Sequence, residues 1–142
     1  PAIILHDVGW KRVPEALHLK AFGPKATCPE VNRVHEVEGV RMARDLLRSV
    51  RYPDPKTEEI LSIIEGHDSR KDSLSLNDRI VKDADKLWRY TEEGFRIDLA
   101  RFQETLEQGL ARLRVGIETW FHTPAAREMA ARDLRERTLV AA

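Results

Sequence analysis

Apolar residues along this chain recur every three or four positions, as on one face of a helix, and no run of useful length alternates as a half-buried strand does. This stripe predicts a helix between residues 31 and 50. A second helix is predicted to begin at Pro55, with Asp54 as its N-cap. A third follows Ser75, whose spacing to Asp78 resembles a capping box with Asp in place of Glu. The pattern therefore predicts an all-α protein.

The clearest amphipathic stripe lies in the C-terminal half of the chain. It comprises Leu99, Phe102, Leu106, Leu110, Leu113, Ile117 and Trp120. This spacing predicts a helix whose apolar face belongs to the core rather than to a cofactor groove. Thr123-Pro124 ends that helix and caps a last one, which fades at residues 140–142. Together with the length of 142 residues, these elements predict a single helical-bundle domain over residues 1–142.

Composition narrows the class of protein. The 24 basic and 24 acidic residues cancel, so no field from net charge favours dedicated nucleic-acid binding. The longest apolar run, Ala2 to Leu5, is far short of the roughly 20 residues that cross a bilayer. A single cysteine and the lack of a signal peptide predict a cytoplasmic protein without membrane attachment. Because the chain begins at Pro1 inside an apolar run, we expect a further helix upstream of it.

Two of the five histidines are followed by aspartate, as His6-Asp7 and His67-Asp68. The first pair follows an apolar run, where a buried helix is expected to end, and a buried carboxylate is costly unless it is paired or bound to a metal. His67 and His35 fall on or beside the apolar faces of their helices. For any one of these histidines, a hydrogen bond to a carbonyl in the core is the simpler interpretation. Together they favour a metal site.

Two further carboxylates lie within one predicted helix. Asp83 and Asp85 flank Ala84 at the two borders of the apolar stripe, so helical geometry treats them alike. Either one could point into a buried site. The alternative is that both are solvated charges paired with lysines.

The residues Leu5-His6-Asp7-Val8-Gly9, followed far downstream by Ile80-Val81-Lys82-Asp83-Ala84-Asp85-Lys86-Leu87, resemble the HD-domain phosphohydrolase superfamily. The resemblance extends over roughly residues 1–90 and leaves 92–142 outside. It implies an all-α bundle with a central metal, and the ligands that it implies are His6, Asp7 and Asp85. The family's first histidine, about one helix upstream of the pair, is expected before Pro1.

The two-metal branch of the superfamily adds further ligands, which His35 and His67 resemble, with Asp7 bridging the ions. Imidazole and carboxylate ligands without thiolate suit Mn, Fe, Co, Ni, Mg or Zn, at one or two ions per chain. Asp68 is the candidate for orienting or deprotonating water, or for contacting a liganding histidine. Lys86 is a candidate phosphate contact. Other basic residues near the motifs are Lys11, Arg12, Arg70 and Lys71.

The resemblance thus implies a metal-dependent phosphohydrolase acting on a nucleotide or another small phosphate ester. One alternative keeps the ligands but uses two iron ions to activate oxygen. Another is a non-catalytic HD module with a regulatory or scaffold role. The segment 92–142 could complete the core or bury a homodimer interface.

Overall fold

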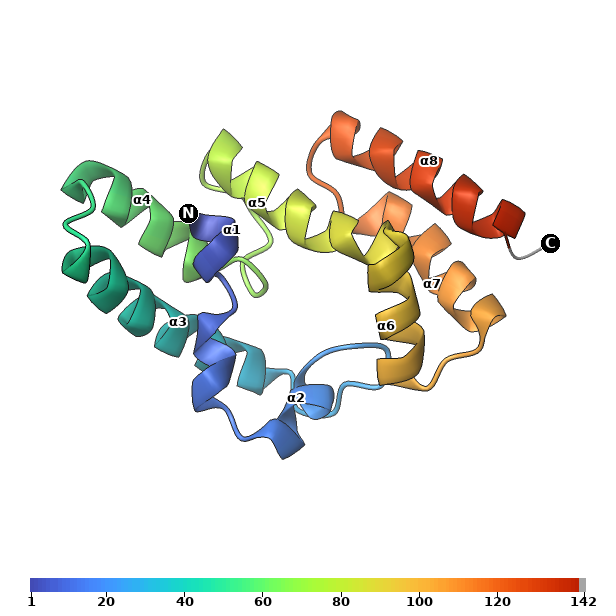
Figure 1. Ribbon diagram of the computed structural model, residues 1–142, viewed down its shortest axis with the longest axis horizontal. Helices are drawn as coiled ribbons and strands as arrows, with labels where there is room; N and C mark the ends of the chain where they lie inside the picture. The colour runs from blue at the N-terminus through green and yellow to red at the C-terminus, as the bar shows by residue number, and fades with distance from the viewer. Residues whose placement is uncertain (141–142) are drawn as a thin grey trace. The chain divides into compact units, whose positions relative to one another are not determined.

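The computed structural model describes residues 1–140, which form eight α-helices, two 3₁₀ helices and no strand. The α-helices are α1 (Ala2–Leu5), α2 (Glu15–Ala21), α3 (Glu30–Ser49), α4 (Asp54–Ile64), α5 (Leu76–Leu87), α6 (Glu92–Phe102), α7 (Leu106–Thr119) and α8 (Pro124–Val140) (Figure 1). The 3₁₀ helices are η1 (Val8–Arg12) and η2 (Trp88–Tyr90). The all-α prediction is confirmed. Every helix in the described range is too short or too polar to cross a membrane.

The helices gather into two compact units, each with a core of its own. The first comprises residues Pro1–Val81, and the second begins at Lys82, so that the boundary falls inside α5. The single domain predicted for residues 1–142 stays a prediction.

The first unit packs η1 and α2 on α3, while α4 lies beside α3 and contacts α1 (Figure 1). Its core is aliphatic and consists of Ala2, Ala43, Leu47, Ile60, Leu61, Ile63 and Ile64. Gly9 allows η1 to lie directly on α3, because a Cβ at this position would stand 1.9 Å from the carbonyl oxygen of His35. This close approach brings the segment that follows α1 onto the first half of α3.

The helix starts in this unit differ in part from the prediction. Pro53, not Asp54, is the N-cap of α4, and no side chain caps that end. At the start of α5, the backbone N–H of Asp78 donates to Ser75 Oγ at 3.2 Å, which is one half of the predicted capping box. The Asp78 carboxylate accepts instead from the N–H of Leu74 at 2.9 Å. It therefore holds the loop before α5.

The second unit contains η2, α6, α7 and α8 around a core with several aromatic residues. The core consists of Tyr90, Phe95, Leu110, Leu113, Phe121, Ala126, Ala130 and Leu134. One continuous helix through the 99–120 stripe is wrong, because α6 ends at Phe102 and Gln103 is left-handed, with φ of 53°. Thr105 and Gln108 then form a capping box that starts α7. The apolar spacing continues across the break, which is why periodicity alone missed it.

Candidate metal centre

Three histidines and two aspartates of the first unit converge from three places in the chain. His6 and Asp7 directly follow α1, His35 lies in the first half of α3, and His67 and Asp68 lie in the turn after α4. Their ligand atoms form two overlapping groups that could each hold a metal ion. One is His6, Asp7 and His67, and the other is His35, His67 and Asp68. The structure thus brings together four of the predicted ligands and the predicted catalytic aspartate.

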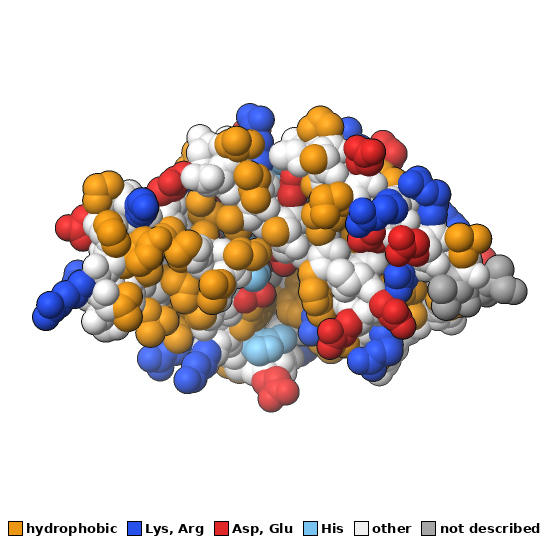
Figure 2. All heavy atoms as spheres, turned by 45° about the horizontal axis from the view of Figure 1, so that its top comes forward, with side chains coloured by type: hydrophobic (Ala, Val, Ile, Leu, Met, Phe, Trp, Pro, Cys, Tyr) orange, Lys and Arg blue, Asp and Glu red, His pale blue; other side chains and the backbone are white. Residues whose placement is uncertain are grey.

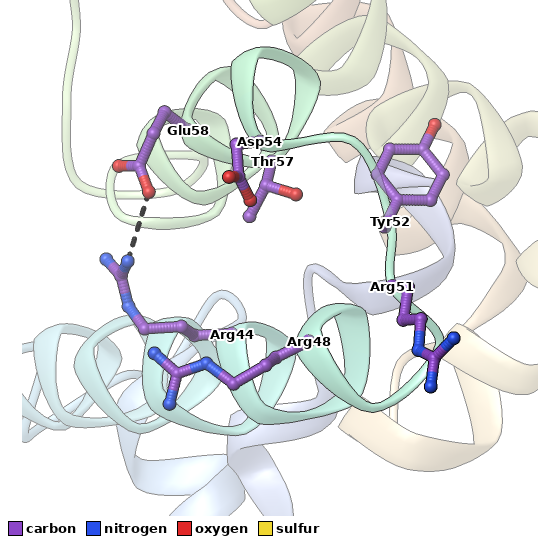
Figure 3. Close-up of a pocket in the computed structure, with 7 residues that line it drawn as sticks. All are labelled: Arg44, Arg48, Arg51, Tyr52, Asp54, Thr57 and Glu58. Carbon is purple, nitrogen blue, oxygen red and sulfur yellow. Dashed lines mark hydrogen bonds and ion pairs between the residues drawn. The ribbon is translucent and has the colours of Figure 1, made fainter.

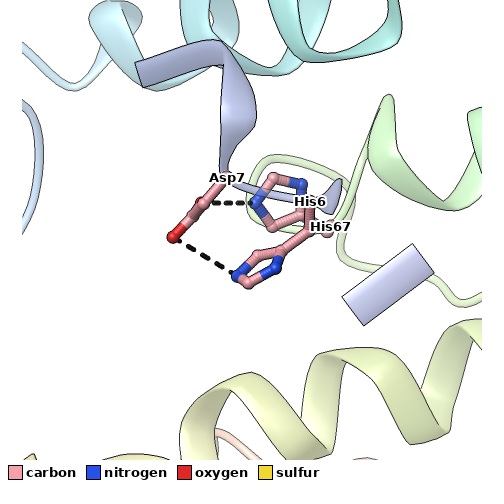
Figure 4. A group of neighbouring side chains, drawn as sticks. All are labelled: His6, Asp7 and His67. Carbon is pink, nitrogen blue, oxygen red and sulfur yellow. Dashed lines mark ion pairs between the residues drawn. The ribbon is translucent and has the colours of Figure 1, made fainter. Parts of the chain in front are cut away.

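The two carboxylate oxygens of Asp7 face different rings. Oδ2 lies 3.3 Å from Nε2 of His6, and Oδ1 lies 3.4 Å from Nε2 of His67 (Figure 4). Nε2 of His35 is 3.6 Å from the same Oδ1. Burial alone would raise the pKa of Asp7, but the hydrogen bonds and charges of His6 and His67 lower it well below its usual range. Asp7 is therefore a carboxylate at neutral pH.

Backbone carbonyls orient the rings of His6 and His67. Nδ1 of His6 lies 2.8 Å from the carbonyl oxygen of Ile3, and Nδ1 of His67 lies 2.8 Å from that of Ile64. Because a carbonyl oxygen can only accept, Nδ1 of each ring carries the proton. Nε2 of each ring then faces Asp7, where it donates to the carboxylate when protonated and can bind a metal ion when it is not. Metal-ligating histidines are oriented in the same way.

His35 is fully buried, and its ring stacks on Trp10 with centroids 4.1 Å apart. Its Nε2 lies 3.2 Å from Nε2 of His67. Burial and the neighbouring His67 lower the pKa of His35, against the opposing charges of Asp68 and Asp7. Burial would lower the pKa of His67, but the hydrogen bond that the ring donates to Asp7 and the charge of Asp68 outweigh it, so the pKa is raised. Two facing ring nitrogens at this distance need a proton or a cation between them.

Two separations in the cluster fit ligands of one metal ion, whereas those to Asp68 are wider. Two ligand atoms about 2.1 Å from one ion stand about 3.0–3.4 Å apart at ordinary coordination angles. The separation of the His35 and His67 nitrogens, 3.2 Å, and that of His67 from Asp7, 3.4 Å, fall in this range. Asp68 Oδ2 is 3.8 Å from the Nε2 atoms of both His35 and His67. The donor set of imidazole nitrogen and carboxylate oxygen suits a divalent ion.

Two residues of this site were missed by sequence reasoning. Trp10 stacks on His35 and also donates from Nε1 to Oδ1 of Asp7 at 3.2 Å. Glu36 is fully buried and accepts from the backbone N–H of Asp68 at 3.0 Å. In the sequence, only their positions could have pointed to these two residues. Trp10 lies one turn after Asp7, and Glu36 directly follows His35.

The residues of the downstream motif lie in the second unit. Asp85 Oδ2 accepts from Lys86 Nζ at 2.7 Å, and the roles of Asp85 as a metal ligand and of Lys86 as a phosphate contact stay predictions. Asp83 is buried, and its carboxylate accepts from the N–H groups of His122 at 2.7 Å and Thr123 at 3.0 Å. Thr123 Oγ1 also donates to it at 2.6 Å. Asp83 therefore anchors the start of α8, which distinguishes it from Asp85.

Two hollows of the first unit lie outside the metal-ligand groups. One, of about 270 Å³, lies between the end of α3 and the start of α4, where Arg44 pairs with Glu58 at 3.1 Å (Figure 3). The other, of about 350 Å³, is mainly apolar and is lined by residues of α1, α4 and α5, on a face where hydrophobic side chains gather (Figure 2). None of the clustered histidines and aspartates lines either hollow.

Comparison with protein-family models identifies the family of the chain. A family model described as HD domain matches residues 2–90, well over half of the chain. Searches of the curated proteins and of the solved structures find no match. The matched range contains all five clustered side chains and also Asp85, and it ends before α6. The family resemblance predicted from the motifs is confirmed.

Proposed function

Because the chain belongs to the HD-domain family, we propose that it is a metal-dependent phosphohydrolase acting on a nucleotide or another small phosphate ester. The convergence of imidazole and carboxylate ligands in two groups that share His67 carries this proposal. Such ligands suit Mn, Fe, Co, Ni, Mg or Zn.

Two ions per chain are favoured by the way Asp7 divides its oxygens. Oδ2 faces His6, whereas Oδ1 faces His35 and His67, so that each oxygen could serve a different ion. Asp85 would add a ligand. This assignment rests only on its position in the downstream motif of the family.

The residues around this centre suit hydrolysis of a phosphate ester. When bound, a divalent metal makes water acidic enough to attack near neutral pH and withdraws charge from a phosphoryl oxygen. The side chain of Asp7 is 52% exposed, so a phosphate can reach the cluster from solvent. Asp68 is partly exposed and close to both His35 and His67, where it would orient the attacking water or accept its proton. Lys86 would contact the substrate phosphate.

The test begins by stripping the protein of metal and reloading it with each candidate ion. Metal per chain and release of phosphate from simple phosphomonoesters, phosphodiesters and a nucleotide panel are then measured. We expect bound metal and metal-dependent release of phosphate. Oxygen uptake with a visible absorption band and no phosphate release would favour the di-iron oxygenase. Bound metal without turnover of any phosphate ester would favour the non-catalytic module.

A further inference from the structure

Glu36 joins the helix that carries His35 to the turn that carries His67. Its Oε1 accepts from the backbone N–H of Asp68 at 3.0 Å and of Ser69 at 2.9 Å. Its Oε2 accepts from Ser69 Oγ at 2.6 Å. Hydrogen bonds to an ionised acceptor are about twice as strong as neutral ones. The residue after His35 is thus bound tightly to the two residues after His67.

Arg33 makes the matching connection on the other side of His67. Its Nη1 donates to Oε2 of Glu36 at 3.2 Å and also to the backbone carbonyl of Glu65. Its Nη2 donates to Oε1 of Glu65 at 3.0 Å. Side chains on both sides of His35 therefore hold the chain on both sides of His67.

The His35 ring needs such external support. A liganding histidine is usually oriented by a hydrogen bond at its second ring nitrogen. His67 has this bond, to the carbonyl of Ile64, but among the described residues Nδ1 of His35 has no hydrogen-bond partner. In addition, the two Nε2 atoms at 3.2 Å repel each other when both present lone pairs. The distance between the rings must be set by the chain around them.

We propose that Arg33 and Glu36 are positioning residues, which hold His35 and His67 at the separation that one metal ion requires; this inference rests on the proposed function. They touch neither the substrate nor the metal. Their effect is to reduce the reorganisation that binding of the ion would otherwise need.

Asp78 supplies a control of the same kind in the same unit. It too is a fully buried carboxylate, and it accepts from the N–H of Leu74 and from Arg70, both at 2.9 Å. These bonds join the loop at Arg70 and Leu74 to the start of α5 rather than linking His35 to His67. Loss of Asp78 should therefore cost stability without changing the metal site.

The experiment compares Glu36→Ala, Arg33→Met and Asp78→Ala in the full chain. The dissociation constant for Mn²⁺, the visible spectrum of the Co²⁺ form and the temperature of unfolding are measured for each. Glu36→Ala should weaken Mn²⁺ binding about 10–100-fold, as losses around metal ligands do, and change the Co²⁺ spectrum. Arg33→Met should change both in the same direction by less. Asp78→Ala should lower the unfolding temperature and keep the parent's Mn²⁺ affinity and Co²⁺ spectrum.

Failure of the inference and failure of the proposed function give different results. Parent-like Mn²⁺ affinity and Co²⁺ spectra in both Glu36→Ala and Arg33→Met would overturn the positioning role and leave the metal site standing. Equal loss of affinity in Asp78→Ala would also overturn it, because the effect would then be general loosening. A parent protein that binds neither ion would refute the proposed function and this inference together. If Glu36→Ala does not fold, Arg33→Met, at a half-exposed side chain, decides by the same measurements.

Discussion

The two units of this chain bury polar side chains with different outcomes. In the second unit, Asp98 is fully buried beside three arginines: Arg89 at 2.8 Å, Arg112 at 3.5 Å and Arg101 at 3.7 Å. Asp83 in the same unit accepts three hydrogen bonds from His122 and Thr123, the two residues before α8. Their charges are compensated within the unit, as buried carboxylates require.

The first unit compensates the buried Glu36 and Asp78 in the same way, but it also directs the ligand atoms of its clustered histidines and Asp7 at one another. Nε2 of His35, Nε2 of His67 and Oδ1 of Asp7 lie within 3.6 Å of one another, in an arrangement that a cation would complete. The comparison teaches that burial of a polar residue does not by itself indicate function. The informative feature is whether the chain supplies the partners, as it does for Asp83 and Asp98.

The largest effect is expected from removing either of the two buried histidines of the cluster. His67→Ala and His35→Ala should each lose the ion at Oδ1 of Asp7 and keep the one at His6 and Oδ2, because Nε2 of His67 is a single donor and faces the same oxygen as His35. Metal per chain is measured by elemental analysis. If both variants keep the parent's metal content and lose only turnover, the centre is not dinuclear, and the two histidines contact the substrate.

Asp85 and Asp83 are expected to differ in what they support: Asp85 metal binding, and Asp83 the stability of the fold. Asp85→Ala should abolish metal binding, on the family register, and leave the second unit folded. Asp83→Ala should keep most of the metal and lower the free energy of unfolding by about 1–3 kcal/mol, because buried donors lose their acceptor. Metal titration and denaturant unfolding measure the two effects. Equal metal losses, or the reverse order, would place the motif at the wrong aspartate.

Removal of metal should affect the two units unequally. At a free-metal concentration of about 100 times the dissociation constant, binding stabilises the folded state by roughly 2.7 kcal/mol. With metal bound, we expect slower hydrogen exchange of the buried amides of α3 and α4, which adjoin the ligands. The exchange of the buried amides of α7 should not change. Exchange is followed by mass spectrometry with metal and after chelation. Equal loss of protection in both units would mean that their stabilities are not independent.

The parts of the fold that were predicted correctly from the sequence are the helices with a regular apolar stripe. Periodicity located α3, α4 and α5, because each buries one regular stripe against neighbours. It joined α6 to α7, because Phe102 and Leu106 keep helical spacing across a break that is set by Gln103 and by the Thr105 cap. It also gave Asp54 the N-cap position that Pro53 occupies. These errors concern single-residue backbone conformations, which an apolar pattern does not contain.

The site was predicted where residue type and motif spacing carry the information. His6, Asp7, His35 and His67 were selected from sequence, and the structure brings them together in the first unit. Trp10 and Glu36 were missed, and the reason is that their roles depend on contacts between segments distant in sequence. Glu36, for example, binds residues 32 and 33 positions away in the sequence. No one-dimensional pattern distinguishes such a buried glutamate from a solvated one.

The smallest expected effect concerns Trp10, which supports the first unit's ligands from one side. Trp10→Phe keeps an aromatic ring for the stack on His35 but removes the Nε1–H that donates to Oδ1 of Asp7 at 3.2 Å. A single net hydrogen bond contributes about 1 kcal/mol, so Mn²⁺ should bind roughly fivefold more weakly. Trp88→Phe, a change in the second unit, is the matched control and should leave the affinity unchanged. A larger loss in Trp10→Phe than in Glu36→Ala would show that the indole, rather than the Arg33 and Glu36 connections, sets the positions of the ligands. No loss at all would mean that Asp7 is oriented by His6 and His67 alone.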